Sequence, residues 1–164
     1  MANNLDELEN FADRVREAWK LGINPIGDLT DTLEALGLLV IVVDEDNPGF
    51  SGLKATALSS DGRSYPIIAV SSQWPGDRQR FTLAHELGHL LLSGHLAVGI
   101  NEEKACDRFA SAFLAPKVAV LQSLGESRRS DFLIRMRISS QILEIDLALY
   151  FGKIGKPHRK NFHF

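Results

Sequence analysis

Cysteine is nearly absent from the 164 residues: Cys106 stands alone, so no disulfide can form within the chain. This argues against a small secreted domain held together by disulfides, and it is consistent with a reducing compartment. The amino-terminal residues are polar and acidic, and they lack the basic start and apolar stretch of a signal peptide. We therefore expect a cytoplasmic protein.

Long apolar runs and an excess of positive charge are also missing. No apolar stretch approaches the roughly 20 residues that a helix needs to cross a bilayer, which argues against a membrane protein. The net charge of −3 argues against direct nucleic-acid binding through bulk electrostatics. What is present is an ordinary globular composition, 45% hydrophobic and 24% charged, in a chain long enough to bury a core.

The apolar periodicity predicts helices and strands that follow one another without a linker. Helices are expected over residues 4–20, 28–36 and 78–93, the last capped by Asp77, and from Asn101 to a break at Pro116. The β-branched run 38–43 predicts a buried strand, and residues 53–58 and 65–70 predict a hairpin. The predicted fold is one α+β domain with a small, mostly antiparallel sheet packed against helices.

Residues 1–152 are expected to form this domain, with 117–152 as its helical carboxyl-terminal part. The basic tail, 153–164, is expected to be loosely ordered. Residues 132–150 loosely resemble a helix-turn-helix whose turn contains Ser139 and Ser140. Glu144 and Asp146 leave the second helix without a basic face, which favours ordinary helical packing over DNA binding.

The strand 65–70 comes directly before the helix 78–93. At an edge of the sheet it could pair with an extended peptide, main chain to main chain, whereas inside the sheet it could not. Pro66 favours the edge, because proline donates no hydrogen bond to a neighbouring strand. No second group that stabilises a transition state can be identified; Tyr65 is a candidate only because it is polar, aromatic and near the hairpin.

The helix 78–93 carries His85, Glu86 and His89 in the order His-Glu-x-x-His. Residues four apart project side by side from a helix, so the two imidazoles could bind one zinc ion. Glu86 lies beside them and could accept a proton from the attacking water as general base. The leucines of this helix form a stripe on the opposite face, as expected for a helix that packs on a core: Leu83, Leu87, Leu90 and Leu91. Gly88 leaves room beside the histidines for another segment or for the metal.

A catalytic zinc ion usually has three protein ligands, and the motif does not identify the third. His95 follows His89 by six residues, the offset of a third histidine ligand in metzincins, but Leu92 occupies the place of the glycine that turns the chain there. Glu103, on the next helix, is the alternative, with Glu102 one residue away as a fallback.

Glu103 and Asp107 are four residues apart and share a helix face. Asp107 could therefore accept a hydrogen bond from a ligating imidazole while Glu103 binds the metal. A simpler interpretation is that Glu102 and Glu103 bind no metal and only interact favourably with the positive end of the helix dipole.

Two segments, RQRFTLAHELGHLLL at 78–92 and EKACDRFASAFLAP at 103–116, resemble the ImmA/IrrE metallopeptidases. That family commonly shows a glutamate, then alanine with asparagine or aspartate, then Phe-Ala and a Leu-x-Pro ending. The match favours Glu103 as the third ligand and Glu86 as the catalytic base. Cys106 stands where alanine is usual, which exchanges one small residue for another. Because it lies in a helix that also supplies a ligand, we interpret Cys106 as a packing residue and not as a nucleophile.

The resemblance extends more weakly from Leu5 to the region of Tyr150. It implies a zincin-like core of gluzincin type, a bound Zn²⁺ ion, and cleavage of a protein substrate such as a DNA-binding repressor. Two other hypotheses stay open: a partner-binding module that does not cleave, and a DNA-binding regulator that uses the carboxyl-terminal helices.

Overall fold

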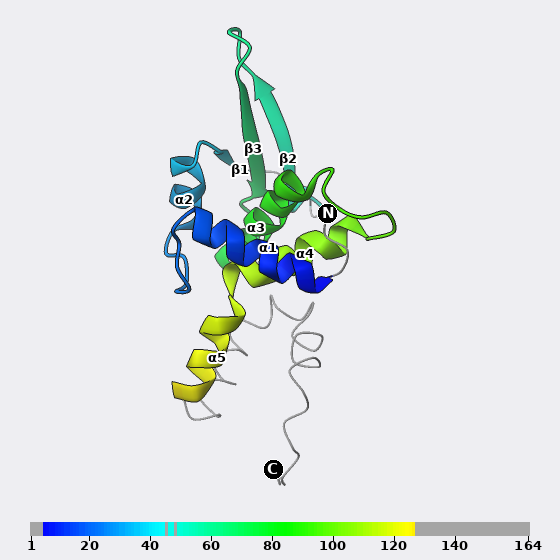
Figure 1. Cartoon of the computed structure of the whole chain (residues 1–164). Coiled ribbons are helices and arrows are strands. Elements are labelled where there is room, and N and C mark those ends of the chain that lie inside the picture. Colours follow the sequence, from blue (N-terminus) through cyan, green and yellow to red (C-terminus); the bar gives the residue numbers. More distant parts are fainter. Residues whose placement is uncertain (1–4, 45, 48, 127–164) are drawn as a thin grey trace.

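The computed structural model describes residues 5–44, 46–47 and 49–126, and its fold is α+β (Figure 1). Its helices are α1 (Leu5–Ala18), α2 (Leu29–Ala35), α3 (Gly76–Leu92), α4 (Glu102–Leu114) and α5 (Lys117–Glu126). Its strands are β1 (Leu39–Val43), β2 (Gly52–Leu58) and β3 (Ser64–Ser71). The helices predicted beyond residue 126, the helix-turn-helix at 132–150 and the tail at 153–164 lie outside the described residues. Within them, no helix is both long and apolar enough to cross a membrane.

The three strands form a mixed sheet in the order β1-β3-β2, in place of the mostly antiparallel sheet that was expected. β2 and β3 pair antiparallel through the predicted hairpin, which projects from the helical body (Figure 1). β1 pairs parallel with β3. The chain runs in the opposite direction through β2 and turns again at the hairpin, so β3 has the same direction as β1.

β3 lies at the centre of the sheet. The prediction from Pro66 that this strand lies at an edge is therefore wrong. The proline is tolerated because the pairing with β1 begins one residue later, at Ile67. Pro66 lies opposite Thr56 in the two-stranded part of the hairpin. β2 is therefore an edge strand of the described sheet, and it is the one nearer to α3 and the predicted site.

β1 is less buried than its apolar sequence predicted. The side chains of Leu39 and Ile41 are each 46% exposed, and Val42 is 57% exposed. β1 lies at the other edge of the sheet, and alternation puts Leu39 and Ile41 on the face opposite the core residues Ile68 and Val70. The prediction of a buried strand is wrong, because a β-branched run is compatible with both environments.

The core lies between α1, α3, α4 and the inner face of the sheet. Phe109 and Phe113 of α4 stack at 5.5 Å, and Trp19 meets Phe113 edge to face. The buried guanidinium of Arg16 donates to the carbonyls of Phe113, Gly22 and Asn24, and so ties α1 and the following turn to the end of α4. This packing holds α4 against both α1 and α3, with α1 crossing in front of α4 in Figure 1.

Of the two capping residues predicted at helix starts, Asn101 is confirmed and Asp77 is not. Asn101 caps α4 as predicted, and its side chain accepts a hydrogen bond from the amide of Lys104 at 2.9 Å. Asp77 does not cap α3: the helix begins at Gly76 after Pro75, whose carbonyl accepts the amide of Gln79. At the other end of α3, Gly94 has a φ of 74°, which suits the predicted stop.

Candidate metal centre

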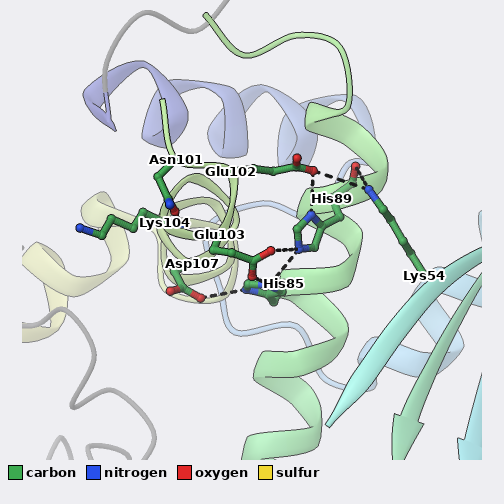
Figure 2. Close-up of polar contacts among 8 residues, drawn as sticks. All are labelled: Lys54, His85, His89, Asn101, Glu102, Glu103, Lys104 and Asp107. Carbon is green, nitrogen blue, oxygen red and sulfur yellow. Dashed lines mark hydrogen bonds and ion pairs between the residues drawn. The ribbon is translucent and has the colours of Figure 1, made fainter. Parts of the chain in front are cut away.

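Gly88 brings α4 close to the helix that carries the histidines. A Cβ atom at this position would lie 3.1 Å from Cδ1 of Phe109 and 3.2 Å from Cα of Cys106. The glycine thus makes room for α4, one of the two possibilities that the sequence suggested. The close approach sets the first turn of α4, with its acidic residues, across from His85 and His89 (Figure 2).

His85, His89 and Glu103 form a compact group whose polar atoms could hold a metal ion. Nε2 of His85 lies 3.1 Å from Nε2 of His89. The carboxylate of Glu103 faces both nitrogens with a different oxygen for each: Oε2 lies 3.3 Å from His85 Nε2, and Oε1 lies 3.4 Å from His89 Nε2. Both histidine side chains are largely buried, with 16% and 11% of their surface exposed.

These separations match those expected around a tetrahedral metal ion. Zinc–nitrogen bonds of about 2.0–2.1 Å place neighbouring ligand atoms about 3.3 Å apart. The orientation of the two rings also indicates a metal site. The Nδ1 atoms of both rings face other carboxylates, so the Nε2 lone pairs are directed at each other and at Glu103. Such a gathering of acceptors is unfavourable without a cation between them. The residues present therefore fit a metal ion.

Each imidazole also has a carboxylate on its outer nitrogen. Nδ1 of His85 lies 2.8 Å from Oδ1 of Asp107, the contact that the spacing of α4 suggested. Nδ1 of His89 lies 2.9 Å from Oε1 of Glu102. Both contacts hold a proton on Nδ1 and leave Nε2 free for a metal. The hydrogen bond that His85 donates to Asp107 is the main cause that raises the pKa of His85, against the opposing effect of burial.

Glu102 has a role that the sequence did not reveal. It was a fallback for the metal ligand, and its carboxylate instead contacts the outer nitrogen of His89 while Glu103 faces the inner one (Figure 2). One signal was available: two ligating histidines commonly need two outer carboxylate or carbonyl partners, and only Asp107 had been assigned.

Glu86 is buried between the histidines and the start of β2. Burial is the main cause that raises the pKa of its carboxyl group, opposed by the nearby His89 and His85. A Cβ atom on Gly52 would lie 3.4 Å from Cγ of Glu86 and 2.4 Å from Cγ2 of Thr82. The backbone of edge strand β2 therefore passes directly beside the candidate base.

The other candidates lie away from this group. His95 is exposed in the turn after α3 and does not belong to the metal-binding group of the described residues. Tyr65 pairs with Ala57 toward the far end of the hairpin, whereas Gly52 and Val70 form the end beside α3. Cys106 is fully buried, and burial raises the pKa of its thiol to about 12, as suits a packing residue and not a nucleophile.

A comparison of the sequence with models of known protein families identifies the family of this chain. The model of the IrrE N-terminal-like domain, peptidase family M78, matches residues 34–152, which is more than half of the sequence. No curated protein matches the chain. The matched range includes both helices that carry the cluster of His85, His89 and Glu103. The chain therefore belongs to the ImmA/IrrE family of metallopeptidases.

Proposed function

We propose that the protein is a zinc-dependent endopeptidase of gluzincin type. His85, His89 and Glu103 would hold Zn²⁺. The observation that supports this most directly is that the two Nε2 atoms lie 3.1 Å apart and that each has a carboxylate oxygen of Glu103 within 3.3–3.4 Å. When bound, the zinc ion would polarise the scissile carbonyl and stabilise the negative charge that develops on its oxygen.

Glu86 is the general base of this proposal. Its carboxylate takes the proton of the attacking water and then delivers it to the amine that leaves. The raised pKa that burial produces suits both steps, because the group holds a proton more readily than an exposed glutamate does. Asp107 and Glu102 keep the two imidazoles in the tautomer that presents Nε2.

The edge of β2 is where we expect the substrate to bind. Gly52 at its start lies beside Glu86, and the side of β2 that does not pair with β3 has no strand partner among the described residues. An extended peptide could add there, main chain to main chain. This replaces β3, the strand that the sequence favoured for the role.

Membership of the ImmA/IrrE family supports a protein substrate, and we propose a DNA-binding repressor or similar regulator in the cytoplasm. Cleavage, not direct contact with nucleic acid, is the activity that we expect, which agrees with the acidic net charge of −3.

The proposal can be tested with Glu86→Gln. Purified protein, loaded with zinc, is incubated with a peptide library prepared from a proteome, and the new termini are identified by mass spectrometry. We expect cleavage by the wild type, none by Glu86→Gln, and equal zinc content in both, with His85→Ala as the variant that loses the metal. Equal cleavage by Glu86→Gln would refute Glu86 as the base, and no cleavage by zinc-loaded wild type would favour a partner-binding module.

A further inference from the structure

Lys54 of β2 reaches the outer side of the metal cluster. Its Nζ atom donates a hydrogen bond to the carbonyl of His89 at 3.3 Å and lies 3.6 Å from Oε1 of Glu102. The same carboxylate oxygen is 2.9 Å from Nδ1 of His89. Edge strand β2, the end of α3 and the first turn of α4 therefore meet through three side chains (Figure 2).

We propose that Glu102 and Lys54 are positioning residues for His89. Glu102 holds the proton on Nδ1 and sets the plane of the ring, so that Nε2 stays directed at the metal. Lys54 acts through Glu102, holding its carboxylate against Nδ1 of His89. This inference rests on the proposed function only in placing the metal at His85, His89 and Glu103.

Glu102 should have the larger effect of the two. Its bond to His89 is short and involves a ring that is 11% exposed, and outer-sphere partners of this kind change metal affinity by about 10-fold to 100-fold. The Lys54–Glu102 pair is looser, with the side chains 36% and 49% exposed. Solvent and salt screen such a pair, so its contribution is small and depends on ionic strength.

The experiment measures zinc affinity, so it needs no substrate. Full-length protein is stripped with a chelator and titrated with zinc against a chromophoric competitor. Relative to the wild type, Glu102→Ala should bind zinc at least about 10-fold more weakly. Glu102→Gln, which keeps an acceptor oxygen but no charge, should lose less affinity. Asp107→Ala is the reference for loss of the equivalent partner of His85.

Lys54→Met should weaken zinc binding by about two-fold to five-fold at low salt and by less at high salt. Because Lys54 acts through Glu102, the change should vanish when Glu102→Ala is already present. Lys104→Met is the matched control, since Lys104 is an exposed lysine of α4 that points away from His89 (Figure 2). It should leave affinity unchanged.

A second measurement separates positioning from a merely structural role. In ¹⁵N-edited NMR spectra of the metal-free wild type, in which no metal ion fixes the tautomer, His89 should be a single tautomer with its proton on Nδ1, and in Glu102→Ala it should become a mixture of both tautomers. Zinc affinity of Glu102→Ala within two-fold of wild type, with Asp107→Ala clearly weakened, would overturn the inference for Glu102. Equal losses from Lys54→Met with and without Glu102 would overturn it for Lys54. If His85→Ala bound zinc as the wild type does, the metal site itself would be wrong, which is a different failure.

Discussion

Asp107 accepts a hydrogen bond from Nδ1 of His85 at 2.8 Å, on the side of the ring opposite the nitrogen that faces Glu103. Asp107 and Glu103 are four residues apart, so one face of α4 contacts both nitrogens of the same imidazole. This hydrogen bond outweighs burial and raises the pKa of His85. The arrangement has a consequence for stability that can be measured without any metal.

In the metal-free protein, the His85–Asp107 pair should make the free energy of unfolding depend on pH. The folded pKa of His85 lies above its ordinary value of 6.5, so the stabilisation is fully present below that value and is lost as the pH rises through the folded pKa. Urea unfolding of chelator-treated protein between about pH 5 and about pH 9 measures this loss.

Asp107→Ala is the control for this pH dependence. It should flatten the fall in stability above 6.5. The raised pKa of Glu86 acts in the same direction, but its contribution begins to be lost above 4.5 and is shared by both proteins, so the comparison removes it. An unchanged pH profile in Asp107→Ala would show that the hydrogen bond does not control the ionisation of His85.

Gly88→Ala should push α4 away from α3. The new methyl group would lie 3.1 Å from Phe109 and 3.2–3.3 Å from Cys106, and overpacking of this kind costs about 1–3 kcal/mol, partly offset by about 1 kcal/mol of gain in helix propensity. Glu103 moves with α4, so zinc affinity should fall as well. Gly76→Ala, at the open start of the same helix, is the control, because a Cβ there meets nothing within 4 Å. Loss of zinc affinity in Gly76→Ala equal to that in Gly88→Ala would refute the packing argument.

The parts of the site that the sequence predicted are those that helical periodicity determines. His85 and His89 on α3, and Glu103 and Asp107 on α4, share helix faces by spacing alone, and the structure brings these two faces together. Glu102 could not be assigned in the same way. Consecutive residues point about 100° apart around a helix, so the orientation of α4 across α3 decides which glutamate faces which nitrogen. That orientation depends on tertiary packing at Gly88.

The sheet was predicted less well, because its pairing is long-range. The hairpin of β2 and β3 was predicted correctly, because hairpins have local signals; here Asp61 and Gly62 lie in the turn between the two strands. The parallel pairing of β1 with β3 joins residues 28 apart, such as Leu39 and Ile67, and leaves no mark in the alternation of either strand. The central place of β3 and the exposure of β1 both follow from that pairing.

Cys106 should resist alkylation in the folded protein. It is fully buried and its pKa is raised to about 12, so almost no thiolate is present near neutral pH. Iodoacetamide labelling, followed by mass spectrometry, should be at least about 100-fold slower in buffer than in concentrated urea. Labelling at comparable rates in both would contradict the buried environment that separates this residue from a catalytic nucleophile.

Gly52→Ala should displace β2 from the candidate base. Its Cβ would lie 2.4 Å from Cγ2 of Thr82 and 3.0 Å from the carbonyl oxygen of Ala69, so the strand must shift, at a cost of about 1–3 kcal/mol of stability. Since the candidate metal ligands lie on α3 and α4, kcat/KM for a cleaved peptide should fall by more than zinc affinity does. Adding Thr82→Ser deletes the clashing methyl group and should restore part of both stability and kcat/KM. Gly27→Ala, where a Cβ meets nothing within 4 Å, should change neither quantity. If the double variant is no more stable than Gly52→Ala, the contact with Thr82 is not what positions β2 beside Glu86.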